Sequence, residues 1–403
     1  MKVLIVSPCD LPVPATKGGA VATLVESLVK QNEKNNEIDL NVISIYDQIA
    51  EEESKKYNNT KFIFWKEPYL FKKIDELYEW FYKNILKKPH QVLKRYMTKI
   101  YILICLKKEL KKNDYDRVIL ENSGYLINIL KDKKIYNKYK NNIYYHVHND
   151  IPENIYVDGL KKCKMILISK YLKKKILKVC GNEVENNIFI LRNGFDCQNF
   201  YGNLEKEKIN EIKNKLNIEN EKIIIFVGRI VEQKGIRELT QAFKNLNLSN
   251  AILLVVGSHN FATNESSIFE QEMKLVFKEL ENKIRFTGYV PYEEIWKYYK
   301  IADLAVLPSV WEEPAGLAML EATASSIPLI TTKSGGIPEY LSEKYVDMLK
   351  IDDNLTINIE KSIKNFFDNE IEYKNRASQA SKIICEQYCE SEFYQNFIKI
   401  IKQ

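Results

Sequence analysis

The sequence predicts an α/β protein made of two doubly wound domains, each with a parallel β-sheet covered by helices on both faces. Short apolar runs alternate with helix-length segments along most of the chain, which is the pattern of such sheets. The alternation is interrupted once, over residues 193–221, by a stretch rich in turn-forming and charged residues. The length of 403 residues also exceeds what one hydrophobic core usually supports, so about two domains are expected.

The first domain is expected to begin with a buried parallel strand at Lys2–Ser7, whose interior is continuously apolar. Gly18 and Gly19 then lead into AVATLVESLVK, where Leu24 and Leu28 have helical spacing. Further strands of this domain are expected at Asp39–Ile45, Arg117–Leu120, Asn142–His148, Met165–Ser169 and Ile188–Leu191.

A second alternating series follows the interruption and defines the second domain, which we place at residues 196–385. The first domain takes residues 1–195 and the end of a last helix, about 386–403, which is expected to span Ile371–Lys402 and to cross back. In doubly wound sheets ligands bind beyond the carboxyl ends of the strands, and we expect a cleft between the two domains there. The expected strands are Lys222–Val227, Ala251–Gly257, Ile284–Thr287, Leu304–Leu307 and Pro328–Thr331.

The composition narrows the class of protein. The net charge is +6, yet Lys83–Lys112 holds ten basic residues and one acidic residue, so the positive charge is local and does not indicate a general nucleic-acid binder. The seven scattered cysteines fit a reduced, cytoplasmic compartment better than a disulfide framework or a zinc site. The apolar run after Lys2 is too short for a signal peptide, and no run reaches the ~18 apolar residues of a membrane span.

Six segments in fixed order carry a resemblance to a known family. The chain resembles the retaining glycosyltransferases of family 4, which have the GT-B fold of two Rossmann-like domains. The second half matches nearly throughout, whereas the first half matches at its glycine loop, its HVHND strand end and ILISKYL. The segments are KGGA (17–20), IFILRNGFD (188–196), FVGRIVEQKG (226–235), FTGYVPYEEIWKYYKIADLAVLPS (286–309), EEPAGLAMLEA (312–322) and SGGIPE (334–339).

The resemblance implies a site for the diphosphate of a nucleotide sugar. The amides of Gly18 and Gly19, in the first strand-to-helix turn, would approach the phosphates. Arg229 and Lys234, which follow the strand that ends at Gly228, would offset the charge of the leaving group. The alternatives are a tight turn that needs glycine and two solvated surface cations.

The resemblance also assigns the two glutamates of the EEPAGLAMLEA segment, which are separated by seven residues. Glu313 would contact the transferred sugar, and Glu321 would accept hydrogen bonds from the ribose hydroxyls. The amides of Ala315, Gly316 and Leu317, at an expected helix start, would touch sugar and phosphate. The alternatives are a helix-capping carboxylate at Glu313 and a solvated helix residue at Glu321.

A histidine pair stands at the end of the strand Asn142–His148. His146 and His148 share one face of that strand because alternate residues do so. In the family a histidine at a strand end points towards the reacting carbon, and His148 is the better match for a role in positioning donor sugar or acceptor. A buried histidine with its hydrogen bonds satisfied is the alternative for both.

The resemblance implies a hexosyltransferase that moves a hexose or deoxyhexose from a nucleoside diphosphate to a hydroxyl of a glycan or lipid-linked glycan, in surface polysaccharide synthesis. No metal or other cofactor is expected, since the cations and amides at the diphosphate suffice. The alternatives are a nucleotide-sugar epimerase of the same fold and a non-catalytic partner subunit, whereas a dinucleotide oxidoreductase is disfavoured because no G-x-G-x-x-G follows the first strand.

Two lysine-rich stretches suggest a further partner. Lys83–Lys112 and Lys161–Lys178 interleave lysine with apolar residues, and we expect them either to lie on the anionic inner face of the plasma membrane or to be solvated helix faces with their apolar stripes in the core. An aromatic group is expected either to stack on sugars or to pack in the core. Its members are Trp65, Tyr69, Phe71, Tyr78, Trp80, Phe81 and Tyr82.

Overall fold

The structure is a computed structural model of the whole chain, and it describes residues 1–8, 10–82, 84, 95–151, 156–258 and 267–403. The chain divides into two compact units. Unit 1 comprises Met1–Ile168, Leu172–Leu191 and Tyr394–Gln403, and unit 2 comprises Ser169–Tyr171 and Arg192–Phe393. Cys9 and most of Lys83–Arg95 lie outside the described residues.

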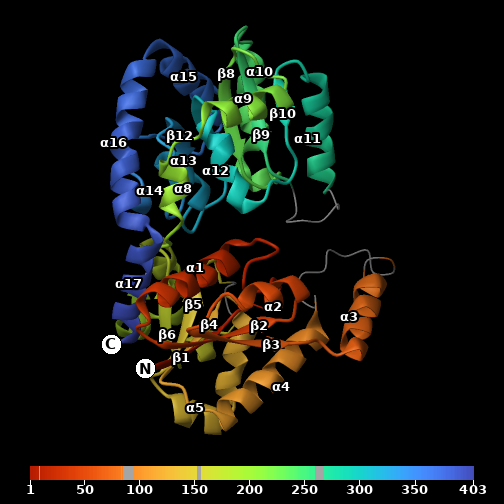
Figure 1. Cartoon of the computed structure of the whole chain (residues 1–403), viewed down its shortest axis with the longest axis vertical. Coiled ribbons are helices and arrows are strands. Elements are labelled where there is room, and N and C mark those ends of the chain that lie inside the picture. The colour runs from red at the N-terminus through yellow and green to blue at the C-terminus, as the bar shows by residue number, and fades with distance from the viewer. Residues whose placement is uncertain (9, 83, 85–94, 152–155, 259–266) are drawn as a thin grey trace. The chain divides into compact units, whose positions relative to one another are not determined.

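Unit 1 contains, within its described residues, a seven-stranded parallel sheet in the order β3-β2-β1-β4-β5-β6-β7 (Figure 1). The central strands are buried on both faces, and their continuous apolar runs are what a parallel sheet between two helix layers requires. The strands are β1 (Lys2–Val6), β2 (Asp39–Ile45), β3 (Thr60–Trp65), β4 (Arg117–Glu121), β5 (Ile143–Val147), β6 (Lys164–Leu167) and β7 (Ile188–Ile190).

Helices cover both faces of this sheet. In Figure 1, α1 and α2 lie on one face and α4 and α5 on the other, as expected when the strand order reverses at β1 and every crossover is right-handed. The helices are α1 (Ala20–Asn35), α2 (Gln48–Ser54), α3 (Tyr69–Phe81), α4 (Tyr96–Lys112), α5 (Lys133–Tyr139), α6 (Val157–Leu160) and α7 (Lys170–Cys180), with 3₁₀ helices η2 (Gly124–Lys131) and η3 (Asn182–Asn187).

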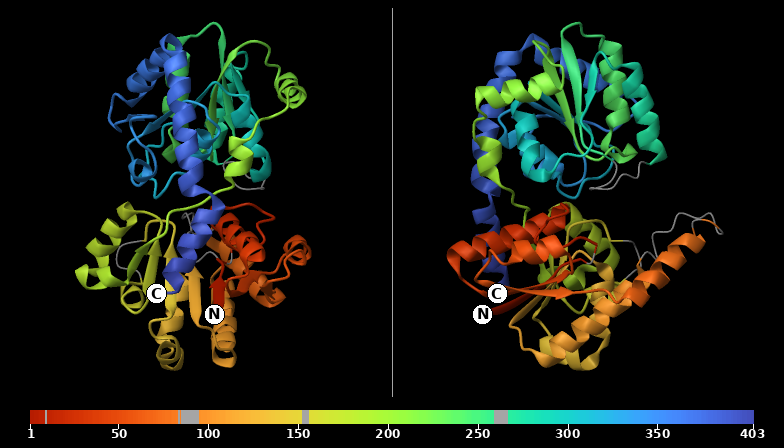
Figure 2. Two further views of the ribbon diagram at one scale, coloured as in Figure 1. Left: turned by 60° about the vertical axis from the view of Figure 1, so that its left-hand side comes forward. Right: turned by 45° about the vertical axis from the view of Figure 1, so that its right-hand side comes forward.

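Unit 2 repeats the architecture with a six-stranded parallel sheet, counted over the residues described for it, in the order β10-β9-β8-β11-β12-β13. Helix α10 packs against α15, and α13 packs against α8 and α16 (Figure 2). Its strands are β8 (Lys222–Val227), β9 (Ala251–Val256), β10 (Ile284–Phe286), β11 (Leu304–Leu307), β12 (Leu329–Thr332) and β13 (Asp347–Leu349). Its helices are α8 (Cys197–Tyr201), α9 (Lys206–Lys215), η4 (Glu232–Lys234), α10 (Ile236–Leu246), α11 (Ile268–Glu279), α12 (Tyr292–Lys300), α13 (Leu317–Ala324), α14 (Ile337–Tyr340), α15 (Leu355–Asp368) and α16 (Glu370–Tyr388), followed by α17 (Glu390–Ile401), which runs into unit 1.

Every strand that the apolar runs predict is present, within one or two residues at its ends. Two further strands escaped the sequence analysis. In β3 aromatic and lysine residues mix, and most of the strand is only half-buried because it forms the edge of its sheet. The other, β13, has three residues and no apolar run. β13 is too short to give an apolar run, whereas β3 does contain one, at residues 62–65, among its half-buried residues.

The prediction of one final helix over Ile371–Lys402 is wrong, because the helix is interrupted at Cys389. Cys389 is extended (φ −68°, ψ 160°) and forms a parallel β-bridge with Phe195. The amide of Phe195 donates to the carbonyl of Tyr388 at 3.0 Å, and so occupies a carbonyl at the end of α16. The interruption divides the segment into α16 and α17.

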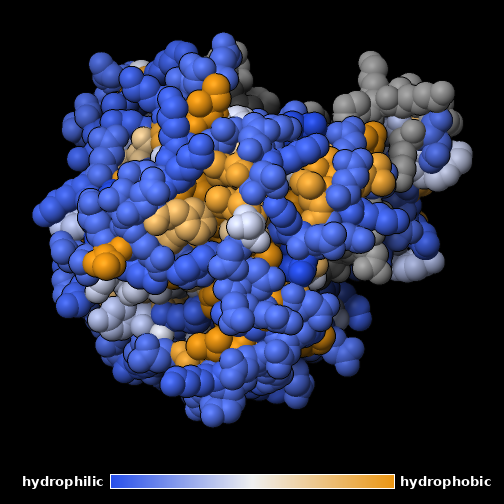
Figure 3. All heavy atoms as spheres, turned by 90° about the horizontal axis from the view of Figure 1, so that it is seen from above, coloured by the Kyte–Doolittle hydropathy of each residue, from blue (hydrophilic) through white to orange (hydrophobic). Residues whose placement is uncertain are grey.

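The lysine-rich helices have their apolar stripes in the core. Leu172 and Ile176 of α7 are buried, as are Ile102 and Leu106 of α4, whereas Lys174 of α7 and Lys107 and Lys108 of α4 are exposed. Helix α3, in contrast, exposes most of the aromatic group, including Tyr69, Tyr78, Trp80 and Phe81. The face of the molecule in Figure 3 shows apolar side chains scattered among hydrophilic ones. Among the described residues, no helix combines the length and the apolar character needed to cross a membrane.

Candidate functional site

The strand order of unit 2 reverses between β8 and β11, and the loops that leave these two adjacent strands hold most of the predicted donor-site residues. The β8 loop carries Arg229 and Lys234, and the β11 loop carries Glu313. The two loops are joined directly, since the amide of Val310 donates to the carbonyl of Gln233 at 3.0 Å. Such a reversal point is where open α/β sheets bind ligands.

Lys234 and Glu313 form an ion pair through Nζ and Oε1. The same carboxylate oxygen accepts a hydrogen bond from the Ser309 hydroxyl at 2.8 Å. The Glu313 side chain is 8% exposed and that of Lys234 27% exposed, so the charges face each other at the boundary between core and solvent. A buried carboxylate needs such partners, because an unpaired charge there is costly.

The backbone around Glu313 is held by the loop after β12. The amide of Gly336 donates to the carbonyl of Glu313 at 2.7 Å. Gly335 has φ +52°, and a Cβ there would lie 2.2 Å from the same carbonyl oxygen, so the contact requires glycine. The SGGIPE segment therefore fixes the position of the predicted sugar-binding glutamate.

Arg229 follows Gly228 at the end of β8 and is exposed. Gly228 has φ +157°, and the carbonyl of Gly228 lies so close to Gly257 that a Cβ on Gly257 would come within 2.0 Å of it. The loops after β8 and β9 thus approach each other through two glycines. The predicted contact of Arg229 with a diphosphate stays a prediction.

Helix α13 begins at Leu317, directly after Gly316, which has φ +81°. Ala315 is buried. The N–H groups of the first helical turn have no partner within the helix and carry partial positive charge, which suits an anion. The structure therefore places Ala315, Gly316 and Leu317 where the resemblance requires a helix start.

Glu321 lies in the middle of α13 and is 5% exposed, so the alternative of a solvated helix residue is wrong. Tyr292 of α12 donates a hydrogen bond to its carboxyl group. Burial raises the pKa of Glu321 to about 7, against the opposing effect of that hydrogen bond. The carboxyl group is thus poised to titrate near neutral pH.

In unit 1, Gly18 and Gly19 form the turn before α1. Their φ angles are +69° and +100°, which side chains rarely adopt. A Cβ on Gly19 would also lie 2.3 Å from the side chain of Leu11. The turn therefore requires glycine whatever its ligand, and its contact with a diphosphate stays a prediction.

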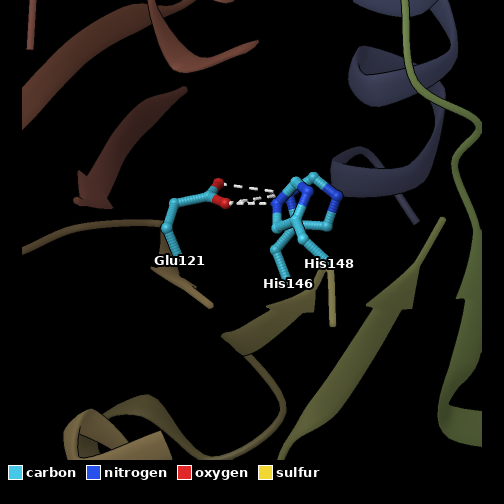
Figure 4. A group of neighbouring side chains, drawn as sticks. All are labelled: Glu121, His146 and His148. Carbon is cyan, nitrogen blue, oxygen red and sulfur yellow. Dashed lines mark hydrogen bonds and ion pairs between the residues drawn. The ribbon is translucent and has the colours of Figure 1, made fainter. Parts of the chain in front are cut away.

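His146 and His148 of the β5 end do share one face, and both contact a third residue, Glu121, the last residue of β4 (Figure 4). Nδ1 of His146 lies 3.2 Å from Glu121 Oε1, and Nε2 of His148 lies 2.9 Å from Glu121 Oε2. All three residues are buried, and the ring centroids of the two histidines are 4.0 Å apart.

The charges of this cluster follow from its contacts. Burial raises the pKa of Glu121, but attraction to His146 and hydrogen bonds from both rings outweigh burial and lower this pKa to about 2. Burial, helped by repulsion from His146, lowers the pKa of His148 to about 4, against the pull of Glu121. At neutral pH Glu121 is therefore ionised and the ring of His148 is neutral.

The sequence analysis missed Glu121, Ser309 and Tyr292 as members of these clusters. The one available signal for Glu121 was its place at the end of the strand RVILE, adjacent in the sheet to the strand that ends in HVH. Tyr292 has no such signal, because its partner Glu321 lies in another segment, whereas Ser309 stands four residues before Glu313 in the same loop.

Residues 208–383 match the family model "Glycosyl transferases group 1". An uncharacterised glycosyltransferase of Methanocaldococcus jannaschii is 33% identical over 191 residues, which is 47% of each chain. Lipopolysaccharide 1,2-N-acetylglucosaminetransferase of Salmonella typhimurium is 29% identical over 49% of this chain and 50% of its own. This chain thus spans about half the length of these two relatives, and the family match lies within unit 2.

The fold is shared over the whole chain. HepE of Anabaena, solved in complex with UDP and glucose, covers 100% of both chains with a TM-score of 0.72 at 16% identity. Sucrose-phosphate synthase of Thermosynechococcus elongatus covers 100% of this chain and 98% of its own, with a TM-score of 0.74 at 15% identity. The two doubly wound units thus have the GT-B fold, and residues 208–383 of unit 2 are similar to the glycosyl transferases of group 1.

Proposed function

We propose that this chain is a retaining glycosyltransferase of family 4 that transfers a hexose or deoxyhexose from a nucleoside-diphosphate sugar to a hydroxyl of a glycan. The observation that carries the proposal is the Lys234–Glu313–Ser309 cluster at the strand reversal of unit 2, beside the start of α13. A cation, a carboxylate and a helix start are the three groups that a phosphate linked to a sugar needs.

The ion pair between Lys234 and Glu313 suggests how the donor is received. In the absence of ligand each charge neutralises the other. A bound diphosphate would attract Lys234 and Arg229, and the freed carboxylate of Glu313 would accept hydrogen bonds from the sugar hydroxyls. The exchange keeps both charges paired at every stage, which avoids the cost of an unpaired buried charge.

The chemistry that we propose is front-face substitution. The bond between the anomeric carbon and the diphosphate oxygen breaks while the acceptor hydroxyl attacks from the same face, and the departing phosphate takes the hydroxyl proton. Arg229, Lys234 and the amides of Gly316 and Leu317 would stabilise the negative charge that develops on the diphosphate. These groups supply that stabilisation, so we propose that neither a protein nucleophile nor a divalent metal ion takes part.

The test is thermal stabilisation by a panel of nucleotide sugars, because a ligand that binds the folded state raises its melting temperature. We expect at least one member to raise the Tm, and Glu321→Gln to reduce that shift by loss of a ribose contact. Glu270→Gln is the matched control, since Glu270 is a buried carboxylate of α11 in the same unit. If no nucleotide sugar shifts the Tm of the wild-type protein, the proposed function fails.

The products made from the stabilising donor separate the alternatives. Incubation with that donor and a mixed glycan acceptor should give a glycoside of unchanged anomeric configuration. A new nucleotide sugar formed without acceptor would indicate an epimerase, and binding without any turnover would indicate a non-catalytic subunit. An inverted product would contradict the retaining mechanism.

We further propose that unit 1 meets an anionic membrane surface, where a lipid-linked acceptor and the assembly of surface polysaccharide would be found. The support is α3, whose Leu70 and Leu77 are each 65% exposed and whose Trp80 is 55% exposed. The positive charge would come from the neighbouring helix α4, whose exposed lysines include Lys107, Lys108, Lys111 and Lys112. Apolar side chains interleaved with lysine suit an interfacial helix.

Liposome co-sedimentation tests the membrane contact. Binding to anionic vesicles should weaken as salt rises, because surface charges are screened. Leu77→Gln with Trp80→Gln should weaken binding, whereas Ile371→Gln, which changes an exposed apolar residue of unit 2, should not. Equal sedimentation with neutral and anionic vesicles, or none with either, contradicts the proposal.

A further inference from the structure

Unit 1 holds a carboxylate with no part in the function argued so far. Glu121 is 1% exposed, and so is His146, whereas His148 is 6% exposed. The backbone ties the three together: the amide of Asn122 donates to the carbonyl of His146, and the side chain of Asn122 accepts from the amide of His148, both at 2.9 Å. Glu121 is thus held against His148 from the side away from solvent.

The hydrogen bonds determine which ring nitrogens carry protons. An ionised carboxylate can only accept hydrogen bonds, so each nitrogen that faces Glu121 must carry a hydrogen. These are Nδ1 of His146 and Nε2 of His148. Because the His148 ring is neutral, its other nitrogen, Nδ1, is left without a proton.

The two remaining nitrogens, His146 Nε2 and His148 Nδ1, are buried and have no hydrogen-bond partner among the described residues. Since His148 Nδ1 carries no proton, only an unused lone pair is left at that atom. Nδ1 of His148, the most exposed of the three residues, is therefore a hydrogen-bond acceptor without a donor in the described ranges. Such an acceptor suits a ligand that donates from a hydroxyl group.

A metal ion fits this geometry less well, although the three facing atoms are close enough to hold one. Metal-bound imidazoles would coordinate through the nitrogens facing Glu121, and the far nitrogens would then carry the protons. Such N–H groups almost always donate to a carboxylate, carbonyl or water. Here both would be buried donors without an acceptor in the described part of the chain, which is rare in proteins.

We propose that Glu121 is a positioning residue that holds the proton of His148 on Nε2 and keeps Nδ1 bare, so that Nδ1 accepts a hydrogen bond from a hydroxyl of the transferred sugar. The hydroxyl contact rests on the proposed function. The tautomer does not, because it follows from the contacts of the three side chains together with the ionised Glu121 and the neutral His148 ring.

Nitrogen NMR of the imidazole rings tests the tautomer directly. The chain has four histidines, and His90→Gln and His259→Gln variants assign the signals of the other two by elimination. Wild-type His148 should show a protonated Nε2 and an unprotonated Nδ1 at neutral pH. A proton on Nδ1 overturns the proposal, and this spectrum needs no substitution at the cluster and no activity.

Glu121→Gln tests whether the carboxylate is the cause. An amide offers one acceptor and one donor group to the two rings, so at least one ring should move its proton to the far nitrogen. Asp75→Asn is the matched control, since Asp75 is a buried carboxylate of unit 1 that contacts Met97 and Thr98 and no histidine. Unchanged His146 and His148 signals in Glu121→Gln overturn the proposal.

Turnover of the donor found by the thermal panel tests the hydroxyl contact. Glu121→Gln should lower kcat by roughly tenfold, the value of one hydrogen bond, with little change in KM. In a His148→Ala background the same substitution should add nothing, because Glu121 acts through that ring. An equal loss in both backgrounds, or stoichiometric binding of Zn²⁺ that is lost in His146→Ala, contradicts the proposal. If the wild type turns over no nucleotide sugar, the proposed function fails while the NMR still decides the tautomer.

Discussion

At the scale of single residues, this protein buries charged groups and gives each a specific partner. Glu313 is paired with Lys234, Glu121 contacts two imidazoles, and Glu321 accepts a hydrogen bond from Tyr292. Buried carboxylates are costly unless paired or neutralised, and each of the three is satisfied differently. Their responses to substitution and to pH should therefore differ.

Removal of one member of the Lys234–Glu313 pair should destabilise the protein more than removal of both. In Lys234→Met the carboxylate of Glu313 stays buried with only the Ser309 hydroxyl as partner, and we expect a loss of about 1–3 kcal/mol in the free energy of unfolding. Lys234→Met with Glu313→Gln should recover most of it without restoring donor binding. Urea unfolding measures both, and additive losses contradict the prediction.

Glu321 should make stability fall as pH rises. Its folded pKa of about 7 lies above the ordinary glutamate value of 4.5, so between these values the unfolded chain releases the proton while the folded chain retains it. Relative to Glu321→Gln, the wild type should lose on the order of 3 kcal/mol of unfolding free energy between pH 4.5 and 7. Parallel curves for the two proteins in urea unfolding across this range would contradict the assignment.

At the scale of elements, the last helix divides its contacts between the units. Up to Phe393 the chain belongs to unit 2, and from Tyr394 it belongs to unit 1, where the Tyr394 hydroxyl donates to Asn32 at 2.7 Å. Phe397 and Ile401 are fully buried. Helix α17 thus contributes its first residues to unit 2 and the remainder to the core of unit 1.

Deletion of Tyr394–Gln403 should therefore destabilise unit 1 selectively. The buried side chains of α17 would leave apolar surface uncovered. Limited proteolysis should then cleave within residues 1–191 first, while the shift in Tm caused by nucleotide sugar persists in the remainder. Lys402→Ala, which removes only a surface ion pair with Glu37, should change the stability by less than about 0.5 kcal/mol. Cleavage of unit 2 first would contradict this division.

At the scale of the whole molecule, the predicted donor-site residues of the second half all lie in unit 2, and Arg229, Lys234 and Glu313 lie on the two loops at its strand reversal. The groups that would face a diphosphate are cations and helix amides. This set by itself can balance the charge of the phosphates, and the proposed chemistry follows from it.

Turnover of the donor should thus be unaffected by EDTA, within twofold, and unaffected by added Mg²⁺ or Mn²⁺ afterwards. Initial rates before chelation, after chelation and after metal addition measure this. A protein that loses activity with EDTA and recovers it with a divalent ion would have a different mechanism at the diphosphate.

The sequence by itself determined the elements that burial on both faces makes continuous, and the helix starts and glycine turns that only certain residues allow. Apolar runs located the central strands, and EEPAGLAMLEA located the start of α13. These signals are local, because the residues of a segment themselves determine its backbone conformation and its pattern of buried positions.

Only the tertiary structure decided what each candidate side chain touches. It paired Glu313 with Lys234, buried Glu321 against Tyr292, interrupted the final helix at Cys389 by its bridge to Phe195 and set Glu121 against His148. Each of these contacts joins segments far apart in the chain. The packing of strands and loops determines which of these side chains meet. The spacing of residues within one segment does not predict that packing.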